Sequence, residues 1–140
     1  MQNEVKHLWH FNQSPEEVWE YLTKPELLEQ WLMKTNFQPV VGHKFYFIGE
    51  CNDEGKEAAQ CEVLEIVPPS RLTYSWQANS MHDNKPFNST VVWTLKPKEN
   101  GTELQLVHTG FVTLEDALAH DQGWSKIGRK MVEQLNAVQL

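Results

Sequence analysis

Three observations predict an α+β domain in which a long C-terminal helix covers one face of an antiparallel sheet. Residues 14–31 have the pattern of two short helices. The middle of the chain alternates apolar and polar residues between turn signals, which is typical of strands. Residues 124–138 repeat apolar side chains at helical spacing. Because the strands have one apolar face and the last helix one apolar stripe, we expect each to bury the other.

The chain opens with an expected strand over residues 5–11, and a helix follows it. Ser14 is a good N-cap, Pro15 suits the first helical position, where no N–H is needed, and Glu17 can complete a capping box. One face of this helix carries Val18, Trp19 and Leu22. Pro25 restarts the chain, and a second apolar stripe follows at Leu27, Leu28 and Trp31.

Residues 44–50 and 60–67 are expected to pair as a hairpin, because the polar loop NDEGK lies between them. A turn centred on the Glu-Gly pair of this loop sets Cys61 opposite Ile48. In this register Cys51 and Cys61 lie several residues apart along the ladder, which is too far for the roughly 4.4–6.8 Å Cα separation of a disulfide. We therefore expect free thiols.

A second expected hairpin joins residues 89–97 to residues 102–109 across Asn100-Gly101, the strongest hairpin signal in the chain. A turn centred on this dipeptide sets Trp93 opposite His108. The face expected to be buried carries Val91, Trp93, Leu95, Leu104, Leu106 and His108. The face expected to meet solvent carries Thr94, Lys96 and Gln105.

The other expected strands show the same alternation. In residues 71–77 the more apolar set is Leu72, Tyr74 and Trp76, and in residues 60–67 it includes Leu64 and Ile66. We expect both sets to face the interior of the sheet.

The closing helix is expected to carry its apolar stripe at Trp124, Ile127, Met131, Leu135 and Val138, and charged residues on the other side. Gly128 lies inside this pattern, although glycine costs about 1 kcal/mol relative to alanine in a helix. We therefore expect another part of the protein to approach the Gly128 backbone closely, with Gly128 facing the sheet or a cavity.

Composition excludes several classes of protein. The net charge is −7 and the pI is near 5.3, which argues against a nucleic-acid or anionic-membrane surface. No apolar run approaches the roughly 20 residues that span a bilayer. Two cysteines are too few for a disulfide framework, and the first residues lack a signal-peptide pattern. We expect one cytoplasmic domain over residues 1–140.

The ordered set of segments resembles a known family. These segments are the run from His10 to Phe47, the strand pair CEVLEIVPPSRLTYSWQ, the hairpin VVWTLKPKENGTELQLVHTGF and Gly123-Trp124. They resemble the activator of heat-shock protein 90 ATPase homologue-like (AHSA-type) family of the START-like, birch-allergen-like superfamily, also called SRPBCC. The resemblance implies a helix-grip fold, in which a curved antiparallel sheet of about six strands wraps a long C-terminal helix and often leaves an apolar cavity. The eukaryotic co-chaperones of the family carry an additional N-terminal domain for chaperone activation, and we do not expect it here.

Aromatic residues supply the candidate ligand-binding site. The chain holds six tryptophans and six phenylalanines, and the expected ligand-binding residues are Phe47, Tyr74, Trp76, Trp93, His108, Trp124 and Met131. One interpretation is a mostly apolar cavity of roughly 300–1,000 Å³ with His108, Tyr74 and the indole N–H groups as its polar contacts. The alternative for each aromatic residue is core packing, which a sheet beneath a helix requires anyway.

His108 is open to two interpretations. It could be a general base or a ligand donor, because histidine titrates near neutral pH. It could also be a partly buried side chain bonded to a backbone carbonyl. The other histidines show no metal-ligand spacing, no GxSxG motif exists, and neither cysteine has an evident activating neighbour. We therefore expect no metal, no cofactor and no catalytic residue.

Different classes of function remain open. The first is a non-enzymatic protein that binds a small hydrophobic molecule, aromatic or lipid-like, in the cavity. The second is an enzyme that resembles the polyketide cyclase and dehydratase branch of the superfamily and uses the same cavity. A third is an interaction module that contacts a chaperone through its outer sheet face. The lack of a carboxylate–histidine pattern favours the first.

Overall fold

The computed structural model describes residues 4–48, 57–80 and 83–137. Over these residues the protein forms one antiparallel sheet of seven strands and three helices. The elements are β1 (Val5–Phe11), α1 (Pro15–Thr23), α2 (Pro25–Trp31), β2 (Lys34–Thr35), β3 (Lys44–Ile48), β4 (Glu57–Val67), β5 (Arg71–Asn79), β6 (Pro86–Lys98), β7 (Gly101–Thr109) and α3 (Leu114–Ala137). The sheet order is β1-β7-β6-β5-β4-β3-β2. The extra strand relative to the expected six is the two-residue β2, which is too short to show an alternating pattern.

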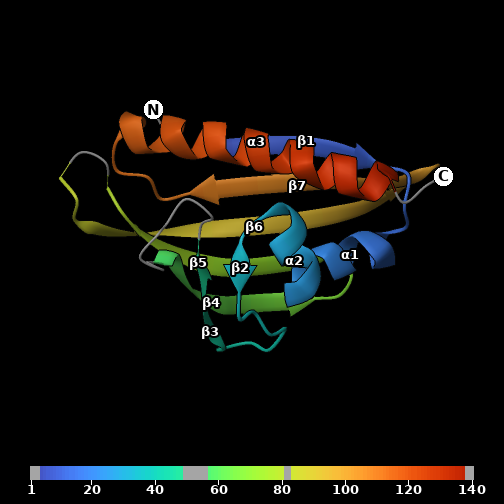
Figure 1. Ribbon diagram of the computed structural model, residues 1–140, viewed down its shortest axis with the longest axis horizontal. Helices are drawn as coiled ribbons and strands as arrows, with labels where there is room; N and C mark the ends of the chain where they lie inside the picture. The colour runs from blue at the N-terminus through green and yellow to red at the C-terminus, as the bar shows by residue number, and fades with distance from the viewer. Residues whose placement is uncertain (1–3, 49–56, 81–82, 138–140) are drawn as a thin grey trace.

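The curled sheet and the long helix α3 form the helix-grip arrangement that the family resemblance implies (Figure 1). Helix α3 packs against β1 and also contacts α2. Helix α1 contacts α2 and the strands β6 and β7. Ser14 caps α1 by accepting a hydrogen bond from the Glu17 backbone N–H at 3.3 Å, as expected. The interior therefore lies between the sheet and these helices.

The β6–β7 hairpin turns at residues 99–100, one position before the expected dipeptide. Trp93 therefore pairs with Leu106 and not with His108, so the predicted register is wrong by two residues. A two-residue shift is one full period of the pleat, so the face of every side chain is unchanged. The predicted inner set is entirely buried: Val91, Trp93, Leu95, Leu104, Leu106 and His108.

Gly101 explains the position of this turn. It is the first residue of β7, where it has φ of 148°. A Cβ at this position would collide with the Phe11 carbonyl oxygen at the end of β1. The glycine is therefore required inside the strand, beside a neighbouring backbone, and not in the turn itself.

The β3–β4 register also differs from the prediction. Cys61 pairs with Phe45 and not with Ile48, and the register shifts between Phe47 and Ile48, where a bulge interrupts the ladder. Cys61 is buried. Cys51 lies outside the described residues, so the expectation of free thiols stays a prediction.

A second bulge, in β4, changes which residues face the interior. The register shifts between Val63 and Glu65, so that Leu64 is the extra residue. Leu64 is 47% exposed, and its predicted inward position is wrong. Beyond the bulge the alternation resumes in the opposite phase, and Ile66 packs against the core as expected. The inward residues before the bulge are Ala59, Cys61 and Val63.

Helix α3 carries the predicted stripe. Trp124, Met131 and Leu135 are buried and Ile127 is partly buried. Val138 lies outside the described residues. Gly128 is also buried, and the approaching group is the Trp9 indole of β1, which confirms the close contact inferred from the glycine.

Candidate functional site

A pocket opens between α3 and the sheet, at the position that the helix-grip fold implies. We call it the interior pocket; its cavity volume is about 210 Å³, and it is lined by Met33, Trp76, Ala119, His120, Gly123, Trp124 and Ile127. Met33 follows α2, Trp76 lies on β5, and the other five belong to α3. The volume is smaller than the predicted 300–1,000 Å³, because large aromatic side chains occupy much of the interior.

The seven predicted ligand-binding residues divide into two groups. Trp76 and Trp124 line the interior pocket. The other five are at most 2% exposed and belong to the core: Phe47, Tyr74, Trp93, His108 and Met131. The sequence assigns all seven to the interior, but it does not distinguish a residue that lines a cavity from one that fills the core.

The aromatic members of this set form one connected cluster. Ring centroids lie 5.4 Å apart for Trp76 and Trp124, 5.5 Å for Trp76 and Phe47, and 5.6 Å for Trp93 and Trp124. These separations are typical of packed aromatic pairs. The wall of the pocket is therefore continuous with the core and held by it.

His108 is held by a chain of hydrogen bonds with a fixed direction. The Trp124 Nε1–H donates to His108 Nδ1 at 3.0 Å, which makes Nδ1 an acceptor. Nε2 must then carry the proton, and it donates to Ser89 Oγ at 2.8 Å. The Ser89 hydroxyl in turn donates to the Trp76 carbonyl oxygen at 2.8 Å.

The buried position of His108 keeps its ring neutral. Burial, and to a lesser degree the nearby His120, lower the pKa of His108 to about 3. Both ring nitrogens are engaged by neighbouring side chains, so neither is left to take a proton from a substrate. The geometry favours the structural interpretation of His108, with Trp124 and Ser89 as its partners in place of the expected backbone carbonyl.

Tyr74 is also held by a hydrogen bond inside the core. Its hydroxyl accepts a hydrogen bond from Trp93 Nε1 at 2.9 Å, and both residues are buried. Burial raises the pKa of Tyr74 well above its ordinary value, against a smaller lowering by the hydrogen bond from Trp93. The phenol therefore stays protonated.

His120 lines the interior pocket, although it is not among the seven ligand-binding residues predicted from the sequence. Its Nδ1 lies 2.9 Å from the Asp116 carbonyl oxygen and must donate to it, which leaves Nε2 as the acceptor of the neutral ring. Burial lowers the pKa of His120, and the Asp116 carbonyl and carboxylate partly oppose this. Its four-residue spacing from Trp124 on α3 is the signal that could have placed it on the same face.

The indole N–H of Trp76 differs from those of the other buried tryptophans. Its side chain is buried, and no described residue accepts a hydrogen bond from its Nε1–H. A buried donor without an acceptor is uncommon and unfavourable. The interior pocket itself has apolar walls and one imidazole, that of His120.

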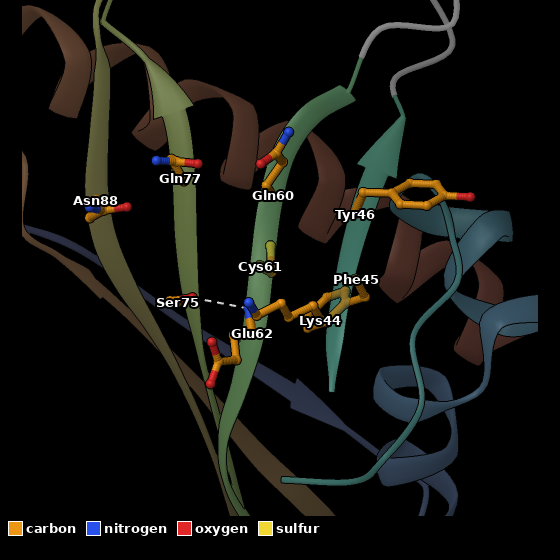
Figure 2. A pocket seen from close by; sticks show the side chains of 9 residues that line it. All are labelled: Lys44, Phe45, Tyr46, Gln60, Cys61, Glu62, Ser75, Gln77 and Asn88. Atoms are coloured by element: carbon orange, nitrogen blue, oxygen red, sulfur yellow. Dashed lines mark hydrogen bonds between the residues drawn. The ribbon is translucent and has the colours of Figure 1, made fainter. Parts of the chain in front are cut away.

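A larger depression, of about 460 Å³, lies on the outer face of β3, β4, β5 and β6 (Figure 2). Tyr46, Gln60, Gln77 and Asn88 are successive cross-strand partners along it. The Glu62 backbone N–H donates to Ser75 Oγ at 3.0 Å, as Figure 2 shows. This face is polar because it is the solvent side of the pleat, opposite the aromatic cluster. Its chemistry suits hydration and does not suit an apolar ligand.

Neither a metal-binding cluster nor a membrane-spanning helix is found in the described part of the chain. No group of three or more histidine, cysteine, aspartate or glutamate side chains there could hold a metal ion. No helix among those residues is both long and apolar enough to span a membrane.

A curled antiparallel sheet that grips a long C-terminal helix around an apolar pocket defines a START-like helix-grip protein. The chain belongs to the family described as activator of Hsp90 ATPase homolog 1-like protein, whose model matches residues 12–136. A search of the curated proteins gave no match.

Solved structures share the fold over nearly the whole chain. Protein MLL2253 from Mesorhizobium loti is 32% identical, with a TM-score of 0.87, over 98% of this chain and 99% of that one. The AHSA1 (SPO3351) protein from Silicibacter pomeroyi is 20% identical, with a TM-score of 0.81, over 98% and 99% of the two chains. DynU16, a putative protein in the dynemicin biosynthetic locus, is 19% identical, with a TM-score of 0.78, over 97% of this chain and 48% of its own length.

Proposed function

We propose that this protein binds a small, mostly apolar molecule of single-ring size in the interior pocket, without catalysing a reaction. The observation that carries the proposal is the pocket of about 210 Å³ between Trp76 and α3. An apolar cavity of about 150 Å³ is large enough for benzene. The volume therefore suits one substituted aromatic ring better than a long lipid chain.

The expected affinity follows from the area that such a ligand can bury. Roughly 200 Å² of apolar ligand surface contributes about 5 kcal/mol at 25 cal/mol per Å². Association costs offset a large part of this gain. We therefore expect dissociation constants between about 10 μM and 1 mM for simple probes.

A polyketide cyclase-like enzyme is the second candidate function, and the likeness to DynU16 is its main support. At 19% identity this likeness concerns the fold alone. Both ring nitrogens of His108 are engaged by neighbouring side chains, and Tyr74 is a buried core residue that does not line the pocket. The binding proposal is therefore preferred. The chaperone-associated module has no comparable support from the pocket.

The test measures probe binding by the wild-type protein and by a variant with a filled pocket. Toluene and ethylbenzene should raise the melting temperature and give saturation-transfer NMR signals, whereas palmitate should not. Gly123 lines the pocket, and a Cβ there would meet nothing within 4 Å, so Gly123→Leu should fill the space and abolish both responses.

The matched control is Lys96→Ala, because Lys96 is an exposed residue of the outer sheet face. This variant should bind the probes as the wild type does. The proposal is wrong if neither probe binds to the wild type, or if Gly123→Leu folds normally and still binds both.

A further inference from the structure

We infer that the molecule bound in the interior pocket is a single-ring phenol whose hydroxyl donates a hydrogen bond to His120 Nε2. The inference rests on the proposed function and adds the chemical class of the ligand. It follows from the orientation of one imidazole ring in the pocket wall and from the side chains packed around that ring.

The first step is the orientation of the His120 ring. His120 belongs to α3 and lines the interior pocket. Its Nδ1 lies 2.9 Å from the carbonyl oxygen of Asp116, one turn earlier in the same helix, and must donate to it. Nε2 carries no hydrogen in the neutral ring and is therefore an acceptor. Because Nδ1 faces the helix backbone, Nε2 at the other end of the ring points away from it.

The second step is that the rings packed around His120 leave this acceptor unused. Ring centroids lie 4.8 Å from His120 for Phe111, 5.3 Å for His108 and 6.1 Å for Phe87. The two phenylalanine rings carry no N–H or O–H group. The one ring proton of His108 is already donated to Ser89. None of these three neighbours can therefore donate to His120 Nε2.

Trp76 is the neighbour that has a donor to spare, and it does not use it on His120. Its ring packs edge-on against His120 with centroids 6.2 Å apart. Its Nε1–H is enclosed and makes no hydrogen bond with His120 or with any other described residue. His120 Nε2 also has no hydrogen bond to a described residue, yet it is not among the enclosed atoms, so it is accessible from outside the core. Since His120 lines the interior pocket, a ligand there can reach Nε2.

The third step is the chemistry that such a pocket selects. One acceptor among apolar walls favours a mostly apolar ligand that carries one donor. The residues that line the pocket include no lysine or arginine, and burial lowers the pKa of His120, so the wall has no positive charge at neutral pH. A carboxylate would lose hydration there without gaining an ionic partner. A phenol is neutral at this pH, since its pKa is about 10, and it carries an O–H donor on a flat apolar ring.

The experiment compares p-cresol, p-xylene and 4-fluorotoluene, which share a methyl-substituted ring and differ in one substituent. These substituents are a hydroxyl donor, a methyl group of similar size and a polar fluorine that cannot donate. Dissociation constants are measured by NMR titration of the full chain at neutral pH. p-Cresol should bind about fivefold more tightly than either of the other probes, which is the scale of one net hydrogen bond.

The ring nitrogens of His120 report the hydrogen bond directly in long-range proton–nitrogen correlation spectra. p-Cresol should move the resonance of the acceptor nitrogen, Nε2, upfield, and Nδ1 should remain the protonated nitrogen. p-Xylene should leave Nε2 close to its position in the free protein. This measurement uses the wild-type protein, so it does not depend on the folding of a variant.

His120→Phe keeps a flat ring in the pocket wall and removes the acceptor. This variant should still bind p-xylene and should lose the preference for p-cresol. His10→Phe is the matched control, because His10 is an exposed residue of β1 and is absent from the pocket wall. The control should keep the preference.

The outcomes separate the two proposals. Equal binding of p-cresol and p-xylene, an unmoved His120 Nε2 resonance, or a preference that survives in His120→Phe overturns the phenol inference and leaves the binding proposal intact. Binding of 4-fluorotoluene as tight as that of p-cresol also overturns it, because polarity without a donor would then be sufficient. Failure of all three probes to bind overturns the binding proposal itself.

Discussion

Trp9 of β1 occupies the space that a side chain at position 128 of α3 would need. A Cβ built on Gly128 would lie 2.6 Å from the Trp9 Nε1 atom. The Trp9 ring also stacks on His7 with centroids 5.4 Å apart, and His7 Nε2 lies 2.9 Å from Asp121 Oδ1 on α3. The contact between Trp9 and Gly128 fixes the distance between the first strand and the last helix.

Gly128→Ala should therefore destabilise the protein, although alanine is the better helix former. Overpacking of this kind costs about 1–3 kcal/mol. Gly123→Ala in the same helix is the matched control, because a Cβ there meets open space, and it should stabilise by up to about 1 kcal/mol. Chemical denaturation measures both free energies of unfolding. Equal effects of the two substitutions would contradict the close contact with Trp9.

Ser89→Ala should break the hydrogen-bond chain of His108. Ser89 is buried, accepts from His108 Nε2 and donates to the Trp76 carbonyl oxygen. Its removal leaves two buried polar groups without this partner, at a cost of about 1–3 kcal/mol. Ser70→Ala, at an exposed serine that bonds the Val67 carbonyl, should cost less than about 0.5 kcal/mol. Urea denaturation compares the two variants, and a Ser89→Ala variant as stable as Ser70→Ala would argue against the chain.

The pH dependence of stability should report the buried neutral His108. Its pKa is about 3 in the folded protein, whereas an unfolded histidine has a pKa of about 6.5. Between these values the unfolded chain binds a proton that the folded protein does not. Stability should therefore fall as the pH drops below about 6.5, by up to about 1.4 kcal/mol per unit, and the contribution should be constant above that pH.

The measurement is the free energy of unfolding between pH 5 and 8. His120 adds to the slope in the same direction, because burial also lowers its pKa. His108→Gln, which can still accept from Trp124 and donate to Ser89, should reduce the slope below pH 6.5. An unchanged slope in this variant would exclude His108 as a source of the acid sensitivity.

The sequence by itself determined the helices, every strand except the two-residue β2, and most of the buried faces. Ser14 and Pro15 specify the start of α1 locally, and the strand alternation specifies inward and outward residues even where the turn position is wrong. The face survives because a shift of two residues in the β6–β7 hairpin preserves the period of the pleat. Gly128 likewise indicated a close contact, since an unfavourable residue in a helix needs a packing reason.

Tertiary structure alone decided the bulge at Leu64 and the collision that places Gly101 in β7, because both depend on the neighbouring strand. It also decided which aromatic residues line the pocket. Trp76 and Trp93 have the same inward alternation, yet Trp93 Nε1–H finds an acceptor in Tyr74 and Trp76 Nε1–H finds none among the described residues. The difference depends on which side chains of other strands and helices lie within hydrogen-bonding distance of each indole. The alternation of residues along one strand carries no information about those neighbours.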